Sequence, residues 1–175
     1  MKQATDIDKY QLAYYGSDIL RKVAPEVKKI DQGVIDLIDG MFHVMKRDRG
    51  IGLAAPQIHV SKKILTINLE VYRGPSIALI NPEIIGDSGD EVPYEEGCLS
   101  VPGIMKEVLR PGEVSVRGVT VEGKEVQIDA DGLFARVLQH EIDHLNGILF
   151  VDHLEDYVRK ELTSELKKIK KLNKK

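Results

Sequence analysis

Apolar residues recur at three- and four-residue steps in the stretch that follows Pro25. The positions are Ile30, Val34, Leu37, Ile38, Met41, Phe42 and Met45. This spacing places them along one side of a helix, so the helix has one face to bury. The pattern therefore predicts an N-terminal helix that ends near Gly50.

A different pattern follows, in which short runs rich in β-branched residues alternate with Gly, Pro and Asp. The runs cover residues 62–69, 76–82, 113–119 and 124–129. Such runs, bounded by turn residues, are typical of strands, and residues 121–124 resemble a hairpin turn. We therefore predict that strands occupy much of the chain between Lys63 and about Asp129.

Two more helices are predicted after the strands. The first has Asp131 as its cap, apolar positions at Leu133, Phe134, Val137, Leu138 and Leu145, and Asn146–Gly147 as its end. The second is an amphipathic C-terminal helix with Leu154, Val158, Leu162, Leu166 and Ile169 on one face. Because the strands are clustered and do not alternate with helices, the order predicts an α+β fold with mostly antiparallel sheets.

Length and composition indicate one domain over residues 1–175. The chain is 42% hydrophobic and 30% charged, which is ordinary for a globular protein, and its one cysteine, Cys98, excludes an internal disulfide. It has neither an apolar run of signal-peptide length near its start nor ~18 consecutive apolar residues. We therefore expect a cytoplasmic protein without a membrane partner.

The charge is distributed unevenly along the chain. Six of the 25 basic residues are lysines in the tail 167–175, so residues 1–166 carry 19 basic against 28 acidic side chains, a net charge of −9. An acidic body gives no support for a DNA-binding face, whereas the basic tail could be attracted to a polyanion.

The stretch HEIDH, residues 140–144, is the strongest indication of chemistry. Residues four apart lie one turn apart on a helix, so His140 and His144 can present ring nitrogens to one metal ion. Glu141 would lie beside that ion and could reach a bound water. The alternative is that these histidines are polar surface groups or satisfied core groups.

A catalytic site of this kind needs a third protein ligand. One large protease group has a histidine at the position of Phe150, which excludes that extended pattern here. The remaining candidates are Cys98, in the segment EEGCLSVPG between predicted strands, and the acids Glu155, Glu161 and Glu165 of the C-terminal helix. A thiolate with two imidazoles would leave one position open for water, a downstream glutamate would indicate a metallopeptidase, and a closed set of four ligands would indicate a structural metal domain.

A third stretch, RGIGLAAPQ at residues 49–57, combines two glycines with small residues. Such a stretch lets the backbone approach a ligand closely, and it lacks the lysine of a phosphate-binding loop. The alternative is a tight connection between a helix and a strand.

Together these stretches closely resemble the three signature motifs of the peptide deformylase family. They are GIGLAAPQ at 50–57, EGCLS at 96–100 and QHEIDH at 139–144, and the similarity extends from about Ser17 to the GILFVDHL that follows the third motif. The resemblance implies a metal-dependent hydrolase that removes the N-formyl group from the N-terminal methionine of new polypeptides and releases formate. It also implies mostly antiparallel sheets around a central metal-binding helix.

The resemblance implies a role for each matching residue. Cys98, His140 and His144 would be metal ligands, and Glu141 would be the catalytic acid and base. Gln57 and the backbone N–H of Leu99 would stabilise the charge on the formyl oxygen. Ile51, Leu133 and Val137 would line the methionine pocket, and the backbone around Gly52 and Gly97 would hold the peptide.

The family commonly holds Fe²⁺ in the cell, and Zn²⁺, Ni²⁺ or Co²⁺ can substitute. The chain departs from the family at His59, where glycine is more common, and it has Met105 and Lys106 in a region of the rim that varies among members. Deformylases that have a C-terminal helix can contact the ribosome through it, which gives the basic tail a possible partner. The alternative for the tail is a frayed, solvated helix end.

Overall fold

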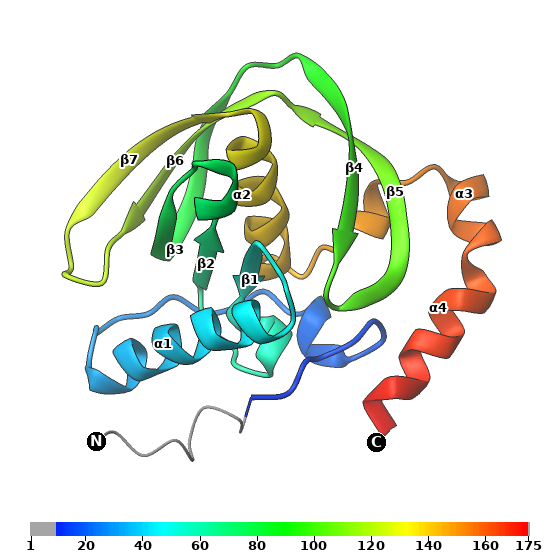
Figure 1. Ribbon diagram of the computed structural model, residues 1–175, viewed down its shortest axis with the longest axis horizontal. Coiled ribbons are helices and arrows are strands. Elements are labelled where there is room, and N and C mark those ends of the chain that lie inside the picture. Colours follow the sequence, from blue (N-terminus) through cyan, green and yellow to red (C-terminus); the bar gives the residue numbers. More distant parts are fainter. Residues whose placement is uncertain (1–9, 175) are drawn as a thin grey trace.

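A five-stranded antiparallel sheet forms the centre of the computed structural model, which describes residues 10–174 (Figure 1). The strand order is β1-β2-β3-β6-β7. The bounds are β1 Gly52–Ala54, β2 Ile64–Asn68, β3 Ser76–Asp87, β6 Glu113–Val119 and β7 Glu125–Asp131. The four strands predicted from the runs are therefore present, and β1 lies within the glycine-containing stretch.

Two long helices cover the two faces of this sheet. Helix α1, Gln32–Arg47, begins where the Asp31 side chain accepts a hydrogen bond from the Val34 N–H, and helix α2 is Gly132–Leu145. On β2, Ile64 belongs to the apolar cluster around α1, whereas its neighbour Leu65 belongs to the cluster around α2. Both faces of β2 are thus buried, which explains why its sequence is an almost continuous apolar run.

Strands β4, Glu91–Cys98, and β5, Val101–Pro111, form a separate two-stranded hairpin beside α2 (Figure 1). These two strands were not among the runs identified in the sequence, and the segment EEGCLSVPG, which was placed between strands, holds the end of β4, the turn and the start of β5. Pro93, Pro102 and Gly97 interrupt the alternation that marks a strand, and a two-stranded hairpin tolerates proline because its outer edges need no further partner. The hairpin matters for function because Cys98 ends β4.

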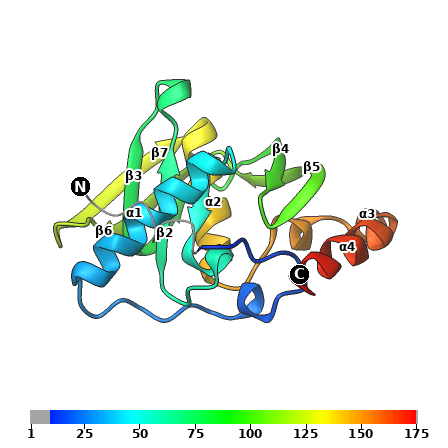
Figure 2. The same ribbon diagram turned by 60° about the horizontal axis from the view of Figure 1, so that its bottom comes forward.

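The C-terminal segment is amphipathic as predicted, but it is not one helix. It consists of α3, Asp156–Glu161, and α4, Thr163–Lys170, followed by a 3-10 turn at Lys171–Lys174. The Thr163 hydroxyl donates to the carbonyl of Lys160 at 2.7 Å, and such side-chain bonds compete with the regular helical pattern. Leu162, Leu166 and Ile169 are nevertheless all buried in an apolar cluster shared with residues of the body. Figure 2 shows the end of the C-terminal segment beside the N-terminal segment that precedes α1.

The predicted hairpin turn and the predicted end of α2 are confirmed, and Asp131 stands at the N-cap of α2, although its side chain makes no capping hydrogen bond there. The hairpin between β6 and β7 turns at Gly123, whose φ of +79° favours glycine, and α2 ends before Asn146 and Gly147. Short 3-10 turns occupy Asp18–Arg21, Ala55–Ile58, Glu70–Tyr72 and Phe150–His153. Over the described residues, no helix has the length and apolar character needed to cross a membrane.

Candidate metal centre and active site

Helix α2 carries the HEIDH residues inward, as their spacing predicted. His140, Glu141 and His144 have exposed fractions of 9%, 4% and 1%, so none is an ordinary surface group. The ring of Phe150 stacks on His140 with its centroid 6.1 Å away. Phe150, which stands where the protease group has its third histidine, therefore packs against His140.

Cys98 is brought to the same place by the end of β4. The ligand atoms of Cys98, His140 and His144 all lie within 4.8 Å of one another, and Cys98 Sγ is 3.3 Å from His144 Nε2. Glu155, Glu161 and Glu165 are exposed and do not belong to the group of potential ligands found among residues 10–174. One thiol and two imidazoles are donors that suit Zn²⁺ or Fe²⁺, so these residues fit a catalytic metal.

A buried carboxylate, Glu96, orients this group, and sequence reasoning missed it. Glu96 Oε2 accepts from His140 Nδ1 at 2.9 Å, which leaves Nε2 as the ring nitrogen available to a metal. Arg110 donates to both oxygens of Glu96 at 2.7 and 3.1 Å, and Arg136 donates to Oε1 at 3.0 Å. The signal was available, because Glu96 lies two residues before Cys98 on β4 and opens the EGCLS motif.

The protonation states follow from these surroundings. Burial acts to raise the pKa of Glu96, but the hydrogen bonds from His140 and Arg110 outweigh it and lower the pKa to about 2, so the side chain is ionised. Burial and the adjacent His140 hold the pKa of His144 well below its usual value. His144 is therefore neutral, which is the form of imidazole that binds a metal.

The side-chain amide of Gln57 is oriented by the turn that follows β1. Its Oε1 accepts from the Ala54 N–H at 2.8 Å, so the Nε2 group points the other way. Nε2 lies 3.3 Å from Ser100 Oγ and 3.5 Å from Cys98 Sγ. Gln57 is 1% exposed, and its donor is thus fixed toward the group of potential ligands.

Glu141 lies against the backbone of Gly52. A Cβ atom at position 52 would be 2.3 Å from Glu141 Oε1 and 2.8 Å from Val137 Cγ1, so only glycine leaves room for the carboxylate. Glu141 Oε2 is buried and has no hydrogen-bond partner among the described residues. Burial raises the pKa of Glu141 to about 7.

These residues open onto one cleft of about 870 Å³. Ten of the eleven residues predicted for the site line it: Ile51, Gly52, Gln57, Gly97, Cys98, Leu99, Leu133, Val137, His140 and Glu141. His144 lies behind them and contacts Cys98. The cleft therefore joins the potential metal ligands to the apolar residues expected to hold methionine.

The cleft also has a wall that the sequence did not predict. Leu12 and Tyr14 near the N-terminus and Leu172 near the C-terminus line it. The tail is remote from the three motifs in sequence, yet the fold brings Leu172 to the same cleft. Of the departures from the family, Met105 lines the cleft with Sδ over Gly97, whereas His59 is exposed and has a φ of +61°, which explains why glycine is common there.

Comparison with known proteins agrees with this geometry. The sequence model described as polypeptide deformylase matches residues 9–160. The chain belongs to the polypeptide deformylase family. The peptide deformylase of Carboxydothermus hydrogenoformans is 48% identical over 151 residues, which cover 86% of this chain and 97% of that protein. The peptide deformylase of Brachyspira hyodysenteriae is 43% identical over 165 residues, which cover 91% of this chain and 88% of that protein.

Solved deformylase structures share the fold. The peptide deformylase of Legionella pneumophila superposes with a TM-score of 0.86 at 42% identity, covering 95% of this chain and 98% of that one. The Synechococcus elongatus peptide deformylase in complex with actinonin gives a TM-score of 0.85 at 40% identity, covering 96% and 89%. The chain is thus a metallohydrolase that removes the N-formyl group from newly made polypeptides, and the metallopeptidase and structural-metal alternatives are set aside.

Proposed function

We propose that Cys98, His140 and His144 hold one divalent metal ion, which is Fe²⁺ in the cell and for which Zn²⁺, Ni²⁺ or Co²⁺ can substitute. The observation that carries this proposal is the approach of the three ligand atoms to within 4.8 Å of one another. Three protein ligands leave a position open, as a catalytic site requires. When bound, the metal supplies a Lewis acid that lets water be deprotonated near neutral pH.

The residues of the chain then have separate tasks in the hydrolysis. Glu141 takes a proton from the attacking water and passes it to the α-amine as the bond between the formyl carbon and nitrogen breaks. Gln57 Nε2 and the Leu99 N–H donate to the formyl oxygen while it carries negative charge. Removing one such donor typically costs about 10²–10³ in rate.

The methionine side chain occupies the apolar part of the cleft. Ile51, Leu133 and Val137 all line the cleft that contains Glu141, and the last two share a face of α2 with His140. Gly52 and Gly97 have no side chains to obstruct a peptide, so their backbones can lie close to it. The substrate is then an extended N-formyl-Met chain whose first residue is the one held most tightly.

We further propose that the chain works as a single catalytic domain in the cytoplasm and meets its substrate at the ribosome. Lys167, Lys168, Lys170, Lys171 and Lys174 of the tail are all exposed, whereas Lys175 lies outside the described residues. Nascent chains emerge beside RNA phosphates, which would attract these lysines and repel the acidic body.

Formate release tests the activity. Anaerobically purified protein of known metal content is expected to release formate from formyl-Met-Ala-Ser and to leave the unformylated Met-Ala-Ser intact. Cleavage of the unformylated peptide without formate release would contradict the proposed function.

A pair of variants tests the assignment of ligand and base. Cys98→Ala is expected to lose tightly bound metal, because two imidazoles leave most of the coordination to water. Glu141→Ala is the matched control: it should keep the metal and lose about 10²–10⁴ in turnover, since it serves proton transfer. Full metal occupancy in Cys98→Ala would place the third ligand elsewhere, and near-normal turnover in Glu141→Ala would remove it from the mechanism.

A further inference from the structure

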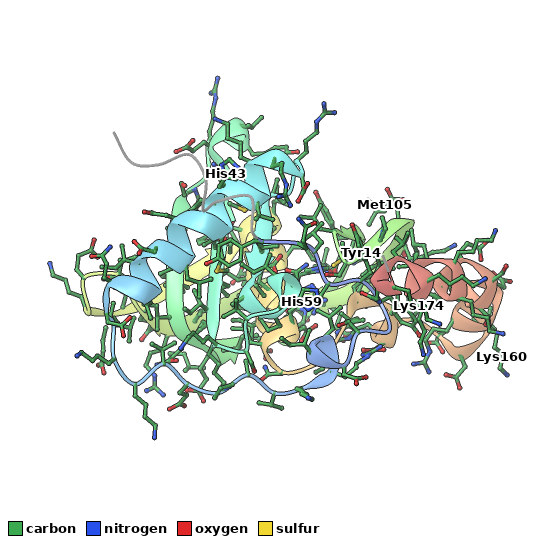
Figure 3. All side chains as sticks on the ribbon, turned by 90° about the horizontal axis from the view of Figure 1, so that it is seen from below. Tyr14, His43, His59, Met105, Lys160 and Lys174 are labelled. Carbon is green, nitrogen blue, oxygen red and sulfur yellow. The ribbon has the colours of Figure 1, made fainter. Side chains whose placement is uncertain are left out.

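Asn173, in the 3-10 turn Lys171–Lys174, binds the N-terminal segment through its side chain. Its Oδ1 accepts from the Tyr14 N–H at 2.9 Å, and its Nδ2 donates to the carbonyls of Tyr14 and Tyr15, each at 3.1 Å. One side chain thus satisfies three backbone groups of a segment 159 positions away in the sequence. Figure 3 shows Tyr14 and Lys174 together where the C-terminal helix meets this segment.

Close packing supports the same contact. Ile169 is 6% exposed and shares an apolar cluster with Ala13. Gly16 has a φ of +89°, and a Cβ atom there would be 2.5 Å from Lys170 Cγ, so the lysine stem lies directly on the glycine. The tail is therefore a packed part of the molecule and not a frayed helix end.

The segment that receives the tail also contacts the active-site loops. The Ala13 N–H donates to the carbonyl of Gln57 and the Tyr15 N–H to the carbonyl of Ser100, both at 2.8 Å. Between them, the Tyr14 N–H points to Asn173. Residues 13–15 therefore link the loops that carry Gln57 and Ser100 to the tail that carries Leu172.

The side chains that this arrangement presents to the cleft are apolar or aromatic. From the N-terminal segment they are Leu12 and Tyr14, and from the tail Leu172, which is 37% exposed. A cleft of about 870 Å³ lies near the upper end of the ~300–1,000 Å³ common for small-molecule sites, so it can hold more than formyl-methionine. A peptide that extends from Glu141 has to continue along these walls.

We propose that Leu172, held by Asn173, forms with Leu12 and Tyr14 a binding wall for a side chain downstream of the N-terminal methionine, and that it gives the enzyme a preference for an apolar residue there. The inference rests on the proposed function, because it takes the cleft to be the peptide site. The segment Lys171–Lys174 is then a specificity-determining element of the enzyme. This segment contributes to substrate binding and not to cleavage of the formyl C–N bond.

Matched peptides test this wall. Formyl-Met peptides with Leu or the similarly sized Asn at the second, third or fourth position are compared with formyl-Met amide, which has no downstream side chain. The wild-type protein is expected to prefer Leu at one of these positions by about three- to tenfold in kcat/KM, through KM, as expected for one partly buried apolar side chain. Leu172→Ala should remove most of this preference by raising KM for the Leu peptide, and this loss should be larger than any change on formyl-Met amide, which does not extend to the wall.

Two further variants distinguish a binding wall from a structural role. Lys171→Ala alters the neighbouring exposed residue, which does not line the cleft, and should keep the preference. Asn173→Ala should weaken it, because Leu172 is no longer held, with little change in kcat. The inference would be overturned if Leu172→Ala kept the preference, or if its kcat/KM fell equally on the Leu peptide and on formyl-Met amide. Absence of formate release by the wild-type protein would instead overturn the proposed function.

Discussion

At the scale of single residues, the active site depends on the absence of a side chain at Gly52. The Glu141 carboxylate occupies the space where any other residue would place its Cβ atom, and the nearest contact would be 2.3 Å. A general base has to stand within hydrogen-bond reach of the proton that it moves. Gly52 is therefore a steric requirement for the position of Glu141, in addition to its proposed contact with the peptide.

Gly52→Ala should accordingly impair catalysis more than folding. The methyl group displaces Glu141, and a misplacement of about 1 Å can cost up to about 100-fold, so we expect kcat to fall about 10–100-fold. Metal content should not change, because the atoms nearest to the added methyl group belong to Glu141 and Val137 and not to the potential metal ligands. Gly86→Ala is the control, since its nearest neighbour would be Ser115 Cβ at 3.9 Å and activity should stay within about twofold. Equal activities of the two variants would refute the steric argument.

At the scale of elements, the site is assembled by holding the β4–β5 hairpin against α2. Arg136 on α2 donates to the carbonyls of Val92 on β4 and Val108 on β5, at 2.6 and 3.1 Å, and to Glu96. Its guanidinium also lies over the Tyr94 ring. Because Cys98 is on this hairpin and both histidines are on α2, Arg136 ties together the two elements that carry the potential metal ligands.

Removal of the Arg136 guanidinium should lower the stability of the protein much more than removal of an exposed ion pair. Arg136→Met removes the hydrogen bonds to the carbonyls of Val92 and Val108 and leaves Arg110 as the one arginine that donates to Glu96 Oε1. We expect the free energy of unfolding in urea to fall by about 3–5 kcal/mol, because a buried ion pair loses one partner. Arg117→Met is the control, because Arg117 pairs with Glu83 where both side chains are at least 60% exposed, and the loss should stay below about 1 kcal/mol. Similar losses in the two variants would show that Arg136 is not a structural tie.

The same elements show how far the sequence could predict the structure. Helix α1 and strand β2 were predictable because their apolar spacing is local, and the three motifs indicated Cys98, His140 and His144 together. The β4–β5 hairpin was not predictable from its pattern, because prolines interrupt it and its apolar Val92 and Leu109 are about half exposed. The motif contains Glu96, but its partners could not be predicted, because Arg110 contacts it across the hairpin and Arg136 only when the hairpin packs on α2.

At the scale of the whole molecule, the tail has two sides with different tasks. Leu166 and Ile169 are buried, and Asn173 binds the N-terminal segment, whereas the lysines of the tail face solvent. Local sequence could not predict this docking, because it pairs residues 159 positions apart. Truncation after Leu166 would remove Ile169 and Leu172 together with the lysines. It therefore cannot separate ribosome contact from the integrity of the cleft.

A charge-removing variant makes that separation. Replacing Lys167, Lys168, Lys171 and Lys174 by Gln keeps Leu172, Asn173 and the Lys170 stem in place, so activity on formyl-Met-Ala should stay within about twofold. Co-sedimentation with ribosomes at low salt should fall sharply, and its dependence on salt should become shallower, since each lysine that contacts a phosphate contributes close to one unit of slope.

The matched control removes four exposed lysines from another part of the surface, by replacing Lys22, Lys28, Lys29 and Lys62 with Gln. Both variants have the same net charge, so a difference between them must come from where the charge lies. The proposed contact requires that the control sediment with ribosomes like the wild-type protein while the tail variant does not. If both variants lost co-sedimentation equally, only net charge would matter. If neither lost it, the tail would not contact the ribosome, and its one remaining role would be to line the cleft.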